Sequence, residues 1–230
     1  MPNPYYEDDF VTLYLGDCLA DHRQWLDADV LVTDPPYGVQ WESKKGSQSK
    51  AKRASLVRNR GAIAGDGDTD ARDAALEAWG QRPAIAFGSW KAPRPDGVRS
   101  LLIWHKEGSY SGPLNAAFFT NHEDIYVMGE GWRKSSPPLR SVITTTEHRS
   151  QAPAIFGHPT PKPVSLMEQL IDRCPPGVIA DPFAGSGSTL VAAKNLRRKA
   201  VGVELEERYC EVIAKRLSQD TLDLFGLDAA

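Results

Sequence analysis

Two short apolar runs in this 230-residue chain each stop at an Asp-Pro step. Val30–Thr33 precedes Asp34-Pro35-Pro36. Val178–Ala180 precedes Asp181-Pro182 in the same way. Continuous apolar or β-branched runs of this length suit strands buried on both faces, and proline cannot donate to a strand ladder, so each strand must end there. Segments with helical spacing alternate with such runs, at Thr69–Trp79, Pro163–Arg173, Ser188–Asn195 and Glu206–Leu217. The alternation predicts an α/β fold with a doubly wound, mostly parallel sheet.

Composition is that of a globular protein, with 41% hydrophobic and 25% charged residues. The length suits one domain spanning residues 1–230. Three widely spaced cysteines without a CxxC pair argue against a disulfide framework and against structural zinc. The polar, acidic start and the lack of a long apolar run predict neither a signal peptide nor a membrane span. We therefore expect a cytoplasmic protein.

The segment Asp181-Pro-Phe-Ala-Gly185-Ser-Gly187 follows one buried strand and opens a helix. Glycines there let the backbone approach a ligand closely. Glu204 ends the next strand, where a carboxylate can accept both hydroxyls of a ribose. A dinucleotide fingerprint would need glycine where Leu190 stands, which disfavours a nicotinamide cofactor and an oxidoreductase. The pattern indicates a nucleoside-cofactor site, although the glycine turn alone fits a structural turn equally well.

Asp34-Pro35-Pro36-Tyr37 also lies at the carboxyl end of a predicted strand, where open α/β sheets bind ligands. An exocyclic amine of a nucleobase is a poor nucleophile because its lone pair is delocalised into the ring. Two acceptors, the Asp34 carboxylate and the Pro35 carbonyl, would draw both amine hydrogens and expose that lone pair. The second proline holds the Pro35 carbonyl rigidly, and Tyr37 offers a flat face to a base extruded from a duplex. A proline-stopped strand with a buried tyrosine is the structural alternative.

Further segments follow in a fixed order: Leu15-Gly16-Asp17-Cys18, Phe87-Gly88-Ser89-Trp90, Trp104-His105-Lys106, His122-Glu123 and His158-Pro-Thr-Pro-Lys162-Pro163. Because of these segments and the two Asp-Pro motifs, the chain resembles the DNA amino-methyltransferases that modify N6 of adenine or N4 of cytosine. The catalytic motif precedes the cofactor motif, which is similar to the permuted, β-type order of that family. The resemblance covers nearly all of the chain outside two basic segments.

The resemblance implies a class I, Rossmann-like methyltransferase with a seven-stranded sheet whose last strand is antiparallel. It implies S-adenosylmethionine as the cofactor and direct methyl transfer without a covalent enzyme intermediate. The implied catalytic residues are Asp34, Pro35, Pro36 and Tyr37. The implied cofactor-binding residues are Asp17, Asp34, His158, Thr160, Lys162, Asp181, Phe183, Ala184, Gly185, Gly187 and Glu204. The resemblance implies that Asp17 binds the adenine of the cofactor and Glu204 its ribose, and that Lys162 closes over the cofactor.

The resemblance predicts site-specific methylation of double-stranded DNA, as in restriction–modification, and Asp34 at the head of the motif favours adenine N6. Three alternatives stay open: an N4-cytosine enzyme, the same chemistry on RNA or a protein side chain, and an inactive module that binds cofactor or DNA. The lack of a Pro-Cys step disfavours C5-cytosine chemistry.

Two segments are candidates for DNA contact: a basic loop at 39–64 and a short target-recognition segment at 129–157, both inserted in the one domain. A net charge of −3 is no objection, because a local patch can steer DNA. Lysine and arginine would contact phosphates and position the enzyme without reading sequence; a merely solvated charge run is the alternative. The candidates are Lys44, Lys45, Lys52, Arg53, Arg58, Arg133, Lys134 and Arg140.

Histidine spacing predicts no metal site, and methyl transfer requires none. The C-terminal stretch Gln219–Phe225 has the look of a sliding-clamp peptide, but its apolar residues suit packing against the core as well. The sequence leaves homodimer formation open.

Overall fold

The computed structural model describes residues 3–38, 67–108, 115, 117–132, 137–146 and 161–223. Its strands are β1 (Tyr6–Glu7), β2 (Val11–Leu15), β3 (Val30–Thr33), β4 (Ala84–Gly88), β5 (Val98–Lys106), β6 (His122–Met128), β7 (Val142–Thr145), β8 (Ile179–Asp181) and β9 (Ala200–Glu204). Its helices are the 3₁₀ helix η1 (Gln24–Asp27), α1 (Asp70–Trp79), α3 (Val164–Ile171), α4 (Ser188–Asn195) and α5 (Glu207–Asp223).

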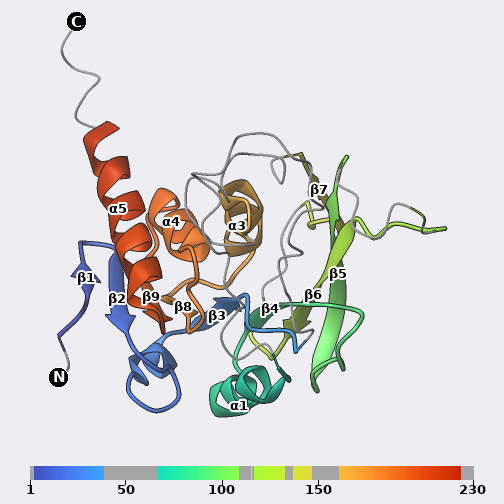
Figure 1. Cartoon of the computed structure of the whole chain (residues 1–230), viewed down its shortest axis with the longest axis horizontal. Coiled ribbons are helices and arrows are strands. Elements are labelled where there is room, and N and C mark those ends of the chain that lie inside the picture. Colours follow the sequence, from blue (N-terminus) through green and yellow to red (C-terminus); the bar gives the residue numbers. More distant parts are fainter. Residues whose placement is uncertain are drawn as a thin grey trace, which may run out of the picture.

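The described strands form one twisted sheet in the order β1-β2-β9-β8-β3-β4-β6-β5-β7 (Figure 1). Five consecutive strands, from β2 to β4, run parallel. Strand β6 is antiparallel to both of its neighbours, β4 and β5, and β1 is antiparallel to β2. The mostly parallel sheet confirms the predicted fold class.

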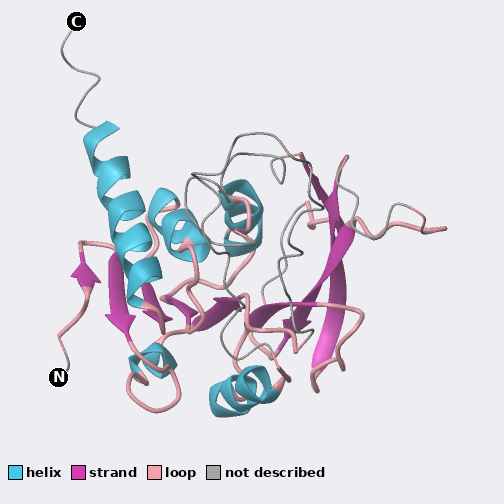
Figure 2. Cartoon of the chain, in the orientation of Figure 1, coloured by secondary structure: helices cyan, strands magenta, loops and turns pink. Residues whose placement is uncertain are grey.

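Helices cover both faces of this sheet (Figures 1 and 2). Helices α3, α4 and α5 lie on one face, and η1 and α1 lie on the other. Because both faces are covered, the central strand β3 is buried throughout, from Val30 to Thr33. On the α1 face, the rings of Trp25 and Trp79 stack with centroids 5.9 Å apart, so η1 packs against α1.

The direction of winding reverses between β8 and β3. From β3 the chain passes through α1 to β4 on one side, and from β8 it passes through α4 to β9 on the other side. Loops that leave neighbouring parallel strands in opposite directions open a crevice at the carboxyl ends of those strands. Asp34 follows β3 and Asp181 ends β8, so both Asp-Pro motifs lie at this end of the sheet.

The sheet is wider than the predicted seven strands. Seven strands, from β2 to β5 in spatial order, match the expected number, and one of them is antiparallel as expected. The antiparallel strand is β6, whereas the last strand in the chain, β9, runs parallel to both of its neighbours. Strand β1 pairs with β2 at one edge, and β7 pairs with β5 at the other. β1 has only two residues, and β7 lies in the segment 129–157 that was expected to serve target recognition, so neither was predicted as a strand.

The sequence of Cys18–Leu26 is also compatible with a helix that turns Trp25 and Leu26 inward, but the structure has only the short 3₁₀ helix η1 at the end of this segment. The Asp17 side chain accepts hydrogen bonds from the backbone amides of Leu19 (2.7 Å) and Ala20 (3.3 Å). Aspartate commonly offers the backbone such local bonds in place of a helix. These residues therefore form turns.

Among the described residues, no helix is long and apolar enough to cross a membrane. The same residues contain no cluster of three or more histidine, cysteine or acidic side chains suited to a metal ion.

Candidate active site

Four neighbouring parallel strands each deliver an acidic residue to the same edge of the sheet. Asp17 follows β2, Glu204 ends β9, Asp181 ends β8, and Asp34 follows β3. The register aligns these ends, because Leu15 pairs with Glu204 and Asp181 pairs with Gly202. Acidic groups that are far apart in sequence thus lie along the same end of the sheet.

The residues Asp181–Gly187, called the glycine loop here, form a tight connection between β8 and α4. The amide of Ala184 donates to the carbonyl of Val203 (3.0 Å), which ties the loop to β9. Gly185 and Gly187 have φ values of 54° and 80°, a left-handed conformation that favours glycine. A Cβ on Gly187 would also lie 2.8 Å from Ile213. These contacts fix the loop at the carboxyl end of β8, immediately before the start of α4.

The Glu204 carboxylate faces the glycine loop and braces it. Its two oxygens accept the amides of Gly185 (2.7 Å) and Glu206 (2.8 Å). Burial, more than any nearby charge, raises the pKa of Glu204 to about 7. Each carboxylate oxygen has two lone pairs, so each can accept a further donor from a ligand.

Asp181 connects the glycine loop to the catalytic motif. Its side chain is buried and accepts the hydroxyl of Thr33 (2.7 Å), the residue before Asp34, and the amide of Phe183 (3.2 Å). Burial is the main cause that raises the pKa of Asp181 to about 6. Thr33 was not expected from the sequence, and its bond fixes the spacing between β3 and β8.

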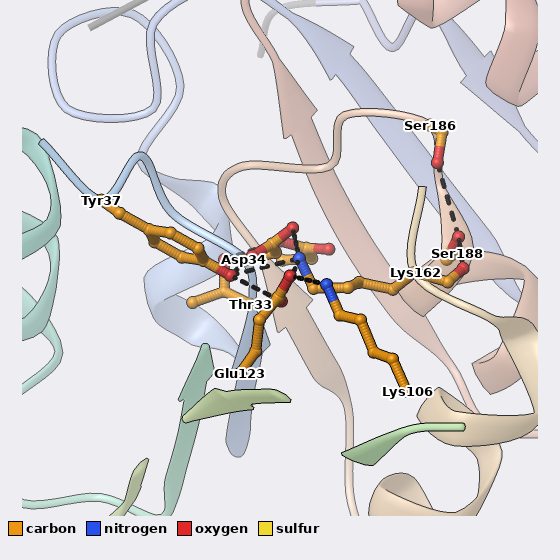
Figure 3. Close-up of polar contacts among 9 residues, drawn as sticks. Thr33, Asp34, Tyr37, Lys106, Glu123, Lys162, Ser186 and Ser188 are labelled. Carbon is orange, nitrogen blue, oxygen red and sulfur yellow. Dashed lines mark hydrogen bonds and ion pairs between the residues drawn. The ribbon is translucent and has the colours of Figure 1, made fainter. Parts of the chain in front are cut away.

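Asp34 and Tyr37 leave β3 and turn toward each other (Figure 3). The Tyr37 hydroxyl donates to the Asp34 carboxylate at 2.6 Å. Pro35 is buried and Pro36 is partly buried, so the motif is held against the domain. Burial and then the Asp34 charge raise the pKa of Tyr37 well above its ordinary value, which keeps the phenol protonated.

Lys162, which the resemblance places over the cofactor, contacts both the catalytic motif and the start of α4. Its ammonium donates to the Asp34 carboxylate and to the Tyr37 hydroxyl (3.2 Å), so it reaches the catalytic motif. Its backbone carbonyl accepts the hydroxyl of Ser188 (2.7 Å), the first residue of α4. Lys162 therefore bridges the catalytic motif and the helix that follows the glycine loop (Figure 3).

Two further charged residues, Glu123 on β6 and Lys106 on β5, complete the site. Glu123 forms ion pairs with Lys106 and with Lys162, the latter at 3.3 Å. Neither Lys106 nor Glu123 was assigned a role from the sequence, although both belong to the quoted motifs. The available signal was the acidic pair Glu123-Asp124 at the start of a strand that continues with apolar residues, since acidic residues are rarely buried without a partner. Asp34, Tyr37, Lys106, Glu123 and Lys162 together are called the polar cluster below.

The polar cluster carries two carboxylates and two ammonium groups. Burial alone would raise the pKa of Glu123, but the charges of Lys162 and Lys106 lower it below its ordinary value. For Lys162, burial acts to lower the pKa, and the carboxylates of Asp34 and Glu123 outweigh it and raise the pKa. Glu123 is thus an anion and Lys162 a cation at neutral pH, and the four charges compensate one another.

The structure describes only some of the other residues that were expected to bind the cofactor or DNA. Asp17 is exposed just after the end of β2, the strand beside β9, and Phe183 packs partly against the core. Arg140 is exposed just before β7. The remaining expected positions lie outside the described residues: His158, Thr160, Lys44, Lys45, Lys52, Arg53, Arg58, Arg133 and Lys134.

A family model described as DNA methylase, N6_N4_Mtase, matches residues 96–216. The Type II methyltransferase M.ScaI of Streptomyces caespitosus is 40% identical over 263 residues, covering 96% of this chain and 86% of that protein. Fold and site together define a methyltransferase of the α/β type. The chain belongs to the N6/N4 family of DNA methylases.

Two solved structures share the fold at low sequence identity. A crystal structure of the M1.HpyAVI–SAM complex has a TM-score of 0.59 at 21% identity, covering 90% of this chain and 99% of that one. PvuII DNA methyltransferase, described as cytosine-N4-specific, has a TM-score of 0.66 at 15% identity, covering 96% of this chain and 93% of that one. At these identities the likeness concerns the fold alone.

Proposed function

We propose that this chain transfers a methyl group from S-adenosylmethionine to the exocyclic amine of a flipped base in double-stranded DNA, with adenine N6 as the target. The observation that carries the proposal is the position of Asp34. Its carboxylate lies at the switch point between β3 and β8, bonded to donors (Tyr37 and Lys162), next to the glycine loop. Because the Asp34 carboxylate accepts hydrogen bonds from these donors at the switch point, it is suited to accept those of a target amine.

The glycine loop and its neighbours fit the cofactor by their chemistry. The carboxylate oxygens of Glu204 retain lone pairs for the two ribose hydroxyls, and the amides near Gly185 and Gly187 lie at the start of α4. Asp17 would accept from the adenine amine. Acidic residues around the crevice favour a cation, and S-adenosylmethionine carries a sulfonium that supplies the methyl group. His158 and Thr160 belong to the same proposal as covers of the cofactor.

Asp34 and the Pro35 carbonyl would accept the two amine hydrogens, so that the nitrogen becomes pyramidal and its lone pair faces the methyl donor. Tyr37 would stack on the flipped base. Holding the base and the donor in line is the larger part of the task, because the sulfonium is already a good leaving group.

Adenine is proposed because an aspartate heads the Asp34–Tyr37 motif. N4 of cytosine is the alternative target, and the same two acceptors would serve it. Mass spectrometry of the nucleosides from methylated DNA separates the two products directly.

Labelled methyl transfer to duplex DNA, RNA and protein tests the proposal. We expect incorporation into duplex DNA alone and none with Asp34→Asn at the same protein concentration. Equal labelling by the wild type and Asp34→Asn would contradict the assignment. Labelling of RNA or protein alone would show that DNA is not the substrate.

The basic loop is proposed as the main phosphate-contacting segment, with Arg133, Lys134 and Arg140 as further contacts. Replacing Lys44, Lys45, Lys52 and Arg53 with alanine removes four charges, and each phosphate contact contributes about 0.9 to the slope of log affinity against log salt. We expect the slope to flatten by about 3 to 4, measured by fluorescence anisotropy with labelled duplex DNA. An unchanged slope would show that these charges are simply solvated.

A further inference from the structure

The ammonium of Lys162 lies between two carboxylates that come from opposite sides of the polar cluster (Figure 3). It is ion-paired with Asp34 from β3 and, at 3.3 Å, with Glu123 from β6. The Lys162 side chain is 5% exposed, against 23% for Asp34 and 17% for Glu123. Lys162 is therefore the most buried charge of this group and the one that most needs a counter-ion.

The proposed function places a conflicting demand on Asp34. A target amine must use the carboxylate that Lys162 and Tyr37 occupy in this structure. If the amine displaced the ammonium and nothing replaced Asp34, Lys162 would be left buried and unpaired, which is strongly unfavourable. A second carboxylate within reach removes that conflict.

Glu123 has the geometry and the charge for this role. Its Oε2 atom lies 3.3 Å from both the Lys162 ammonium and the Tyr37 hydroxyl, the two donors that now bond to Asp34. Its Oε1 atom is paired with Lys106, whose ammonium also lies 4.5 Å from the centroid of the Trp104 ring. Lys106 thus holds Glu123 in place and leaves Oε2 directed at the two donors.

The attachment of Lys162 limits its movement to the side chain. Ser188 holds its backbone carbonyl at 2.7 Å, and the Phe87 ring lies 4.9 Å from its ammonium. A shift of the ammonium from Asp34 toward Glu123 is a short side-chain movement that leaves this anchorage intact.

We propose that Glu123 is a positioning residue that takes over the Lys162 ammonium and the Tyr37 hydroxyl when Asp34 engages the target amine. Glu123 makes Asp34 available without breaking the charge balance of the cluster, and it acts through Lys162 without touching the base. This inference rests on the proposed function, since it presumes that Asp34 binds an amine.

A double-mutant cycle tests this coupling. The variants are Glu123→Gln, Lys162→Met and the double variant, and single-turnover transfer of a tritiated methyl group to duplex DNA is measured for each. Misplacement of reacting groups costs about 10²-fold in rate, and we expect a loss of this size for Glu123→Gln in the wild-type background. In the Lys162→Met background, the same substitution should cost about twofold or less, because its partner is absent.

Further readouts separate positioning from general structure. Cofactor affinity and DNA affinity of Glu123→Gln should stay within about twofold of the wild type, so the loss falls on the transfer step. Glu123→Asp retains the charge and should restore the rate to within about tenfold. If Glu123→Gln does not fold, the cycle is run with Glu123→Asp. Glu211→Gln is the matched control, since Glu211 lies on α5, is 57% exposed and lies outside the cluster and both segments proposed for DNA contact; its rate should equal that of the wild type.

Equal losses from Glu123→Gln with and without Lys162, or no loss at all, would overturn the inference. A loss of cofactor affinity that accounts for the rate would overturn it too. These outcomes differ from failure of the proposed function, in which the wild type itself transfers no methyl group to DNA.

Discussion

The pKa values of the buried carboxylates shift in opposite directions on the two sides of the site. One side, called the glycine-loop side here, contains Asp181 and Glu204, and the other is the polar cluster. On the glycine-loop side, burial raises the pKa of Asp181 to about 6 and of Glu204 to about 7. Among the ion pairs of the described residues, no lysine or arginine pairs with either acid. In the polar cluster, Lys162 and Lys106 lower the pKa of Glu123 despite its burial.

The difference indicates which kind of ligand each side of the site suits. Carboxylates that are buried without a cation gain most from a ligand that brings positive charge or hydrogen-bond donors, as S-adenosylmethionine does. The polar cluster is already neutral overall, so it suits an uncharged ligand such as a base amine. The two sides should therefore respond differently to substitution and to pH.

The largest expected effect is that of Asp34→Asn. Loss of one charged acceptor at the reacting nitrogen should lower single-turnover methyl transfer by about 10³-fold or more. Cofactor affinity, measured by isothermal titration calorimetry, should stay within about twofold because the glycine loop is unchanged. A parallel loss of cofactor affinity would break the distinction between the two sides.

Glu204→Gln should give the reverse pattern. A hydrogen bond to a charged group contributes about 1.5–3 kcal/mol, so cofactor affinity should fall by roughly 10- to 100-fold. At saturating cofactor, transfer should recover to near the wild-type rate. A rate that remains low at saturation would place Glu204 among the groups needed for the chemical step.

The smallest effect concerns pH. Because the pKa of Glu204 is raised to about 7, its carboxyl is mostly protonated below that pH and mostly ionised above it. If the ionised form binds the ribose hydroxyls, cofactor affinity should rise about tenfold from pH 6 to pH 8.

Glu204→Gln is the control for this titration, measured by calorimetry over the same range. It should leave only the shallower dependence contributed by Asp181, whose pKa is raised to about 6. An affinity that falls with rising pH, or an equal slope in the variant, would contradict the assignment.

Local sequence was sufficient to predict the parts of the site made by contiguous residues. The two Asp-Pro steps end buried strands as expected, and the glycine loop begins α4 at Ser188 as predicted. Backbone geometry decides these features, and glycine and proline reveal it directly.

The polar cluster needed the tertiary fold. Glu123 reaches Lys162 only because β6 inserts antiparallel beside β4, and β5 follows it outward. Strand order depends on pairing between distant segments, which the local pattern of β6 does not encode. For the same reason, the Thr33–Asp181 bond joins residues 148 positions apart and had no local signal.

Nucleoside mass spectrometry tests the central claim most directly. Genomic DNA is digested from a methylation-free host that expresses either the wild type or Asp34→Asn at equal protein level. The account predicts N6-methyladenine with the wild type and none with the variant. N4-methylcytosine would contradict the choice of adenine. Absence of any methylated base with folded wild-type protein, or equal amounts with both proteins, would contradict the proposed activity of the Asp34 site.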